Sequence, residues 1–269
     1  MDLQLAGQVA VVIGGAQGIG RAIARGFVEE HAHVVLADRD PAVTATATQL
    51  TAEGGANVQA IMADATDYDA MQRVARFAED QFGGYHHVVF AVGAGSGKFG
   101  FPFWNLTPAD WDQVLRVNLT AAANVAHAFS PALVRARAGS FLFLSSIAGQ
   151  IGSQTDPPYS AAKAGLINFA QCAAKDLAEY DVRVNTICPG MIQTALNRSV
   201  WQAWYNQQPP EERRSYDDWA GEKVRRVSPL GRWQTGEDVA ALAVFLASPR
   251  ARNITGQTMN VDGGQVMHS

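Results

Sequence analysis

A tyrosine, a lysine and a serine in the middle of the chain have types and a spacing that suit acid–base chemistry. Tyr159 and Lys163 are four residues apart in a segment with a helical pattern, so they share one helix face. An ammonium group beside a phenol stabilises the phenolate and lowers the pKa of the tyrosine. Ser146 ends an apolar run thirteen residues before Tyr159. Because Tyr-x-x-x-Lys is common by chance in helices, the pair needs further support before it indicates an active site.

A glycine-rich turn precedes the first helical pattern. Gly14, Gly18 and Gly20 follow the apolar run Val9–Ile13 with the spacing Gly-x-x-x-Gly-x-Gly. Glycines let the backbone approach a pyrophosphate, and the helix start supplies free N–H groups and a partial positive charge. A tight turn without a ligand uses the same residues. The position after the first strand of an alternating chain favours a dinucleotide phosphate site.

Two acidic residues follow the next apolar runs. Asp38 lies eighteen residues beyond Gly20, where a carboxylate can accept hydrogen bonds from the ribose of adenosine and repel a 2′-phosphate. Gln17 adds no cation to the turn, so these residues favour NAD. Arg39, directly after Asp38, leaves NADP as an alternative. Asp64, at the end of the third run, is expected either to bind the adenine edge or to cap a helix.

Strands and helices alternate along the chain and would position these residues. Seven short apolar runs are expected to be strands: Val9–Ile13, Val34–Asp38, Val58–Met62, Val88–Val92, Ser140–Ser145, Val182–Cys188 and Thr258–Val261. Six longer segments are expected to be helices: Arg21–Glu30, Pro41–Glu53, Thr66–Phe82, Pro108–Ala136, Ala161–Tyr180 and Glu237–Ala247. Such alternation predicts a Rossmann-like, doubly wound α/β fold, with a seven-stranded parallel sheet and helices on both faces. Because no linker interrupts it, we expect one domain over residues 1–269.

One segment breaks the alternation. Residues 196–226 contain eleven charged residues, interleaved with aromatic ones. Long insertions in compact domains are usually functional lids or disordered, and the aromatic content argues against disorder. We therefore expect a substrate-binding lid, and a charged surface decoration is the alternative.

Composition excludes several classes of protein. The chain has 269 residues, of which 48% are hydrophobic and 17% charged, so it is neither disordered nor fibrous. Its net charge is −4 and its Lys and Arg residues are scattered, which disfavours nucleic acid and anionic membranes as partners. Cys172, Cys188 and the six histidines lack metal-ligand spacing, so no metal is expected. The amino terminus has no basic segment of a signal peptide, and no apolar run reaches 18 residues, so we expect a cytoplasmic protein.

Several motifs together resemble the short-chain dehydrogenase/reductase family. They are the glycine turn, Asn118 in Val117-Asn118-Leu119, Ser146, Tyr159-x-x-x-Lys163, Asn185 followed by Pro189-Gly190, and the closing Val261-Asp262-Gly263-Gly264. They occur in the order and spacing of the family, from about Leu5 to Gly264. This resemblance covers nearly the whole chain.

The resemblance implies a role for each catalytic residue. Tyr159 would be the general acid/base, and Ser146 would orient the substrate oxygen. Lys163 would lower the pKa of Tyr159 and hold the nicotinamide ribose, and Asn118 would place a water in a proton relay behind Lys163.

Cofactor contacts are likewise implied along the chain. Pro189-Gly190 would form the wall beside the nicotinamide, with Ile192 near its carboxamide and Thr194 near a phosphate. The expected cofactor-binding residues are Gly14, Gln17, Gly18, Ile19, Gly20, Asp38, Asp64, Ala65, Gly93, Tyr159, Lys163, Pro189, Gly190, Ile192 and Thr194.

Two departures from the family pattern occur on strands expected to be neighbours. Ile13 stands where the family usually has Thr, and Phe90-Ala91-Val92-Gly93 stands where it usually has Asn-Asn-Ala-Gly. Replacing both partners of a hydrogen bond by apolar groups can be nearly neutral. We expect a compensated change that spares the fold.

These inferences favour an NAD-dependent oxidoreductase that interconverts a secondary alcohol, such as a polyol, sugar or cyclic alcohol, and its ketone. One alternative is an NADP-preferring reductase of 3-oxoacyl thioesters or ketones. Another is a catalytically silent dinucleotide-binding sensor or scaffold. Residues expected to contact the substrate are Ser96, Ser146, Gln154, Tyr159, Met191 and Trp201. Small residues on the two longest expected helices, together with the resemblance, predict a homotetramer.

Overall fold

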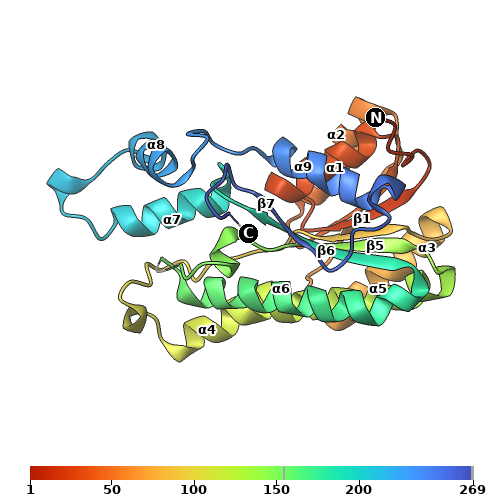
Figure 1. Cartoon of the computed structure of the whole chain (residues 1–269), viewed down its shortest axis with the longest axis horizontal. Coiled ribbons are helices and arrows are strands. Elements are labelled where there is room, and N and C mark those ends of the chain that lie inside the picture. The colour runs from red at the N-terminus through yellow and green to blue at the C-terminus, as the bar shows by residue number, and fades with distance from the viewer. Residues whose placement is uncertain (154, 268–269) are drawn as a thin grey trace.

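The computed structural model describes residues 1–153 and 155–267 and confirms the predicted α/β fold (Figure 1). Seven parallel strands form one sheet in the order β3-β2-β1-β4-β5-β6-β7. Their bounds are β1 (Val9–Ile13), β2 (His33–Asp38), β3 (Val58–Met62), β4 (His87–Phe90), β5 (Gly139–Leu144), β6 (Val182–Pro189) and β7 (Thr258–Val261). The strand order reverses between β1 and β4, the place where ligands bind in open α/β sheets.

Helices cover both faces of the sheet, as alternating side chains of the central strands require. On β1, Ala10 and Val12 face one core, while Val9 and Val11 face the other. The first core is covered by α1 (Gly18–Glu29), α2 (Ala42–Gly54) and α9 (Gly236–Ala247). The second is covered by α3 (Tyr68–Phe82), α5 (Ala121–Ala136) and α6 (Pro157–Leu177).

The predicted helix Pro108–Ala136 is confirmed over its full length, but it contains an irregular turn that the sequence did not predict. It divides into α4 (Pro108–Leu115), a π-helical turn η2 (Arg116–Thr120) and α5. A π turn adds one residue to a helical turn and is frequent at functional sites. It contains the fully buried Asn118, whose amide bonds to backbone outside the helix.

Short one-turn helices complete the connections: η1 (Phe103–Asn105), η3 (Ile147–Gly149), η4 (Ala178–Tyr180), η5 (Pro210–Glu212) and η6 (Pro249–Ala251). Helix α6 begins earlier than the expected Ala161. Asp156 caps it and Pro157 occupies its first turn, where a missing N–H has no consequence.

The two departures from the family pattern meet in the sheet. Ile13 pairs in register with Phe90, and both side chains are buried. The backbone joins the strand ends instead, since the N–H of Ala91 donates to the carbonyl of Ile13 at 2.8 Å. An apolar residue on one strand therefore faces an apolar residue on its neighbour.

Residues 195–227 form a helical pair beside the sheet rather than on either of its faces (Figure 1). Helix α7 (Ala195–Tyr205) packs on α8 (Tyr216–Val227) through aromatic rings. The ring centroids of Trp201 and Tyr216 are 5.8 Å apart, and those of Trp204 and Trp219 are 6.0 Å apart. These aromatic contacts explain why the charged segment is ordered as helices.

Candidate active site

The candidate site includes two clefts, which open at the carboxyl edge of the sheet, where the strands end. The glycine turn follows β1, Gly93 lies in the loop after β4, and Ser146 lies just beyond β5. The turn needs its glycines: Gly14 and Gly18 have φ of 88° and 58°, in the left-handed region. A Cβ on Gly20 would collide with the carbonyl of Gly14. Gln17 precedes α1 without a side-chain cap, which leaves the first N–H groups of that helix free for a ligand.

One cleft lies between the ends of β1, β2, β3 and β4. Six of the expected cofactor-binding residues line it: Gly14, Gln17, Asp38, Asp64, Ala65 and Gly93. Arg39 lines it as well. Their convergence is what a dinucleotide site at the reversal of strand order requires.

The two acidic residues of this cleft are held by backbone amides. Asp38 accepts hydrogen bonds from the N–H groups of Ala16 and Asp40, each at 3.0 Å. Asp64 accepts from the N–H and the hydroxyl of Thr66, each at 2.8 Å, and the backbone bond is the main cause of its lowered pKa. Asp67, not Asp64, caps α3. Asp64 is thus turned toward the cleft edge and does not begin a helix.

A second cleft lies on the other side of the glycine turn. It brings together four more of the expected residues, Gly18, Ile19, Ile192 and Thr194. Sequence reasoning missed Gln234, whose Oε1 accepts from the N–H of Met191 at 3.0 Å and which also lines this cleft. Only its place in the fold identifies it, because no local motif contains it.

Three of the expected cofactor residues support the clefts from behind. Gly20 lies under the glycine turn, and Pro189 pairs with Val261 in the sheet. Gly190 packs so closely on β7 that a Cβ there would lie 2.7 Å from the Cα of Asp262. None of the three is among the residues that line these two clefts.

Tyr159 lies in the first turn of α6, where an interaction with the Ser146 side chain lowers the pKa of its hydroxyl. Ser146 itself caps η3, where its Oγ accepts from the N–H of Ala148 at 3.1 Å. Burial raises the pKa of Tyr159 to about 12, and the Ser146 hydrogen bond opposes that rise. At neutral pH the phenol therefore carries its proton.

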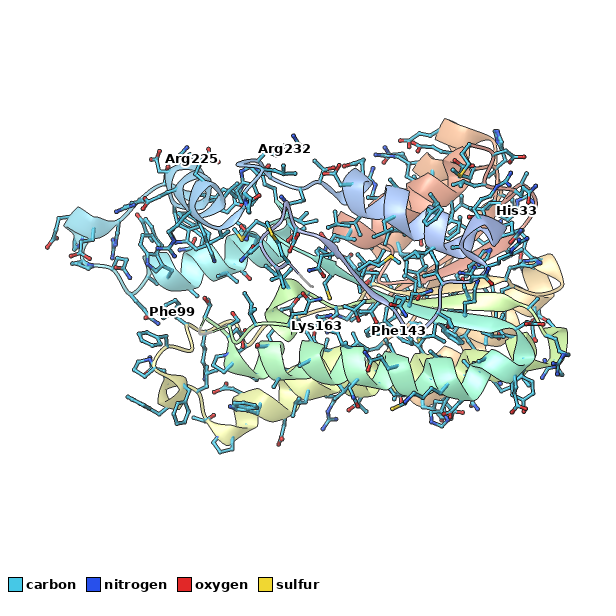
Figure 2. The ribbon with its side chains drawn as sticks, in the orientation of Figure 1. His33, Phe99, Phe143, Lys163, Arg225 and Arg232 are labelled. Atoms are coloured by element: carbon cyan, nitrogen blue, oxygen red, sulfur yellow. The ribbon has the colours of Figure 1, made fainter. Side chains whose placement is uncertain are left out.

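Lys163 is directed at the strand ends rather than at the phenol oxygen. Its Nζ donates to the carbonyls of Leu144, at 2.8 Å, and Val92, at 3.3 Å, and lies 5.6 Å from the centroid of the Tyr159 ring. The side chain lies in the layer between α6 and the sheet (Figure 2). Burial lowers the pKa of Lys163 to about 7.

Burial sets both pKa values in the protein alone, and a lowering of the pKa of Tyr159 by Lys163 in the enzyme with its cofactor stays a prediction. Burial penalises the charged form of each group, so it raises the pKa of the acid Tyr159 and lowers that of the base Lys163. Nearby carbonyls accept from the ammonium and stabilise it in place. The pair is a neutral proton donor beside a readily deprotonated amine.

Asn118 fixes the loop that follows β4. Its Nδ2 donates to the carbonyls of Ala94, at 2.7 Å, and Val114, at 2.9 Å, while its Oδ1 accepts from the N–H of Ala94 at 3.3 Å. A Cβ on Gly93 would lie 3.5 Å from both Asn118 Oδ1 and Lys163 Nζ. Asn118 and Lys163 thus approach the same loop from two helices, and a water relay between them stays a prediction.

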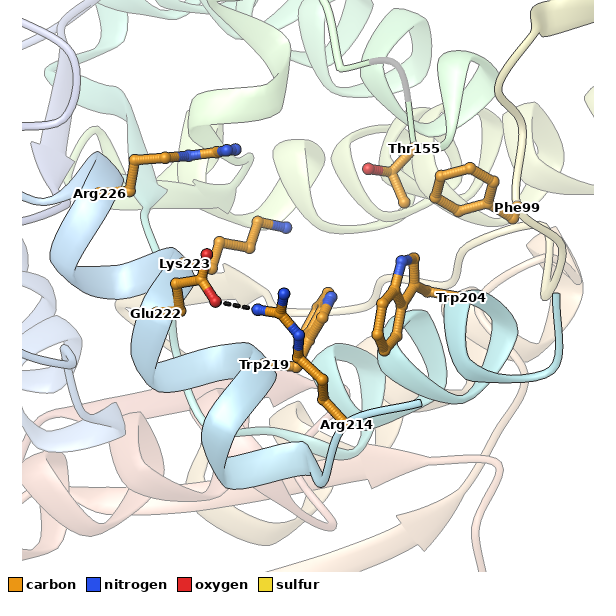
Figure 3. Close-up of a pocket in the computed structure, with 8 residues that line it drawn as sticks. All are labelled: Phe99, Thr155, Trp204, Arg214, Trp219, Glu222, Lys223 and Arg226. Atoms are coloured by element: carbon orange, nitrogen blue, oxygen red, sulfur yellow. Dashed lines mark hydrogen bonds and ion pairs between the residues drawn. The ribbon is translucent and has the colours of Figure 1, made fainter. Parts of the chain in front are cut away.

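Tyr159 forms part of the wall of a pocket. Its other lining residues include Gly95, Thr155, Asp156 and Lys223, and sequence reasoning missed Lys223 because it lies in a run of charges. The pocket shares Thr155 and Lys223 with a neighbouring one that contains Trp204 and Trp219 (Figure 3).

The other expected substrate residues have different positions. Ser96 donates from its N–H and Oγ to Asp156, at 2.7 and 3.1 Å, and so supports the pocket wall. Met191 is buried, and Trp201 turns toward α8, where its Nε1 donates to the carbonyl of Arg214 at 3.1 Å. Neither lines the Tyr159 pocket. Gln154 lies outside the described residues.

Within residues 1–153 and 155–267, no three His, Cys, Asp or Glu side chains are grouped so that they could hold a metal ion. No helix in this part of the chain has the length and apolar character needed to cross a membrane.

Known proteins are similar to this chain in sequence and in fold. A family model described as enoyl-(acyl carrier protein) reductase matches residues 14–266. Acetoacetyl-CoA reductase of Synechocystis sp. is 34% identical over 266 residues, which cover 98% of each chain. Galactitol 2-dehydrogenase of Agrobacterium fabrum is 32% identical over 270 residues, 98% of this chain and 100% of the relative. The structure of L-sorbose reductase from Gluconobacter frateurii, complexed with NADPH and L-sorbose, is 27% identical and superposes with a TM-score of 0.90 over 100% of both chains.

Proposed function

The chain belongs to the short-chain dehydrogenase/reductase family and is an oxidoreductase acting on CH–OH groups; from this premise we propose that it interconverts a secondary alcohol and a ketone with NAD. The observation that carries the proposal is a pair of side chains: Tyr159, which forms part of a pocket wall, and Ser146, whose interaction with Tyr159 lowers the pKa of that phenol. A silent sensor or scaffold has no physical need for this pair together with Lys163 and Asn118.

The clefts fit a nicotinamide dinucleotide. Gly14, Gly18 and Gly20 leave the space in which a pyrophosphate lies against backbone N–H groups. Asp38 faces the adenosine end, and Ile192 with Thr194 faces the other. When bound, the nicotinamide supplies or accepts the hydride.

Side chains of the protein donate and accept the proton. In the direction of reduction, Ser146 donates a hydrogen bond to the ketone oxygen, and Tyr159 transfers its hydroxyl proton to that oxygen as the alcohol forms. In oxidation the tyrosinate takes the proton back. Lys163, whose Nζ bonds to the strand-end carbonyls and not to the phenol, would resupply the proton through the water relay predicted with Asn118.

NAD is favoured over NADP by the carboxylate of Asp38, which lines the adenosine cleft and would repel a 2′-phosphate. Support for the alternative comes from Arg39 in the same cleft and from the NADPH complex of the L-sorbose reductase. The L-sorbose complex of that reductase and the similarity to galactitol 2-dehydrogenase support a polyol or sugar as substrate, whereas the similarity to acetoacetyl-CoA reductase supports the alternative 3-oxoacyl thioester. The predicted cytoplasmic location stays a prediction.

Replacing Tyr159 tests the acid–base role. Tyr159→Phe removes the transferable proton, so the turnover number should fall by about 10²–10⁴-fold, whereas the Kd of NAD should change only a few-fold. Steady-state NADH formation with a panel of polyols, sugars and cyclic alcohols measures the first, and fluorescence titration the second. Tyr68→Phe, at an exposed position on α3, is the matched control and should be silent. More than about a tenth of wild-type turnover in Tyr159→Phe would contradict the assignment.

Cofactor preference is tested at Asp38. Asp38→Ala should raise the Kd of NAD by about 10–100-fold, because a charge-assisted hydrogen bond is lost. It should also reduce the difference between the Kd values of NAD and NADP. Asp38→Asn removes the charge and keeps an acceptor for the N–H of Ala16, at the loss of the acceptor for the N–H of Asp40, so it should improve binding of NADP more selectively. The Kd values of NAD and NADP, measured for each variant and for the unaltered enzyme, test these expectations. A preference of the unaltered enzyme for NADP would overturn the proposal.

The segment 196–226 is proposed to be a lid over the substrate. Its aromatic residues can face inward when it is closed, while its charges remain in water, and closure would exclude water from hydride transfer. Adding NAD and a turned-over substrate should slow amide hydrogen exchange of residues 201–219 without affecting the sheet. Unchanged exchange there would indicate a rigid surface decoration.

Assembly as a homotetramer is proposed from the outer groove between α5 and α6. Ala126, Pro131, Phe169 and Ala173 line this groove, and small residues there permit close approach of a second pair of helices. Light scattering at micromolar concentration should give four times the chain mass of 28.8 kDa. A monomeric mass would contradict this assembly.

A further inference from the structure

Lys223 of α8 lines the Tyr159 pocket and forms no ion pair with any residue that the structure describes. It belongs to both that pocket and the neighbouring one, and its side chain is half-buried. Across residues 1–153 and 155–267, its ammonium makes no hydrogen bond or ion pair. Its contact is the ring of Trp219, 4.9 Å from Nζ to the centroid. Burial lowers the pKa of Lys223, and repulsion by Arg226 lowers it further.

Other charges around these pockets do not neutralise Lys223. Arg226, three residues further along α8, lies on the same helix face and in the part of the chain that is described has no ion pair either. Figure 3 shows Lys223 and Arg226 pointing from α8 toward the side where Thr155 and Phe99 lie.

Both carboxylates near these cations have other partners. Glu222 is paired with Arg214. Asp156 accepts from the N–H and Oγ of Ser96 at the edge of the Tyr159 pocket, and burial raises its pKa. Neither carboxylate forms an ion pair with Lys223 or Arg226.

Such an arrangement is unfavourable in the protein alone. Like charges three residues apart on a helix repel, and a partly buried cation loses hydration that no partner replaces. A ligand oxyanion would reduce both the repulsion between the cations and the cost of the lost hydration. Trp219 and Phe99 supply apolar faces beside the two cations, suited to the carbon chain of such a ligand.

We propose, resting on the proposed function, that the substrate carries an oxyanion, a carboxylate or a phosphate, which pairs with Lys223 while its carbonyl or hydroxyl carbon lies at Tyr159 and Ser146. Arg226 provides a second positive charge behind Lys223. Specificity for charged over neutral substrates then arises from α8, outside the sheet and away from the reacting atoms.

Matched substrates test this in the full-length protein with NADH and NADPH. Linear keto acids with one to five carbons between ketone and carboxylate are compared with their methyl esters, and dihydroxyacetone phosphate with dihydroxyacetone. The charged member of at least one pair should have a kcat/KM at least about tenfold higher. A preference within the keto-acid pairs identifies a carboxylate, and a preference within the triose pair identifies a phosphate.

Variants on α8 connect the preference to Lys223. Lys223→Met should lower kcat/KM for the charged member by about 10–100-fold and leave the neutral member within about threefold. Lys223→Arg should restore most of the preference, which a loss of folding would not allow. Arg225→Met removes a cation that is exposed on the same helix and lines neither pocket, so it should have no effect.

Binding supplies a readout that is independent of turnover. In a Tyr159→Phe background with NADH, the preferred charged probe should quench tryptophan fluorescence, because Trp219 lies beside Lys223, and Lys223→Met should weaken that binding by a similar factor. Equal use of charged and neutral members by the unaltered enzyme, or equal losses on both in Lys223→Met, would overturn the oxyanion proposal while leaving the alcohol–ketone function intact. Absence of turnover of any alcohol or ketone with either cofactor would overturn both.

Discussion

A buried ammonium group holds the catalytic end of the molecule together. Lys163 is 2% exposed, and its nearest partners are the carbonyls at the ends of β4 and β5. Those bonds compensate part of its lost hydration and attach α6 to the sheet edge. The hydroxyl of Ser145 strengthens the same attachment by donating to the backbone carbonyl of Lys163 at 2.8 Å. Tyr159, one helical turn earlier, is thereby fixed beside Ser146.

The loop after β4 depends on this arrangement. Its glycine, Gly93, leaves room for the side chains of Asn118 and Lys163, which approach it from different helices. Asn118 reaches the loop because the π turn η2 interrupts the helix and directs the amide to the backbone of Ala94. A regular helix would place successive side chains at 100° and would turn this amide elsewhere. The irregular turn and the buried cation thus define one rigid corner between the cofactor clefts and the substrate pocket.

Helices α7 and α8, which we propose to select the substrate, are structurally separate from this corner. Helices α7 and α8 lie beside the sheet and are held by aromatic and cation–π contacts, including those of Trp219 with Trp204 and Lys223. Changes in this helical pair can alter the pocket without disturbing the strands or the glycine turn. The relatives, whose names include a polyol dehydrogenase, a sugar reductase and a thioester reductase, are consistent with one scaffold that serves several substrates.

The sequence by itself determined the features that local chemistry fixes. Apolar runs specify strands, glycines with positive φ specify the turn, and Tyr159 and Lys163 share a helix face at any position in a fold. Only the tertiary structure decided what depends on distant neighbours. It divided the helix at Asn118, turned Trp201 toward α8 instead of the substrate pocket, and placed Lys223 beside Tyr159. It also determined the burial that raises the pKa of Tyr159 in the protein alone, because desolvation is set by everything packed around a group, whereas spacing along the chain reports only its nearest helical neighbours.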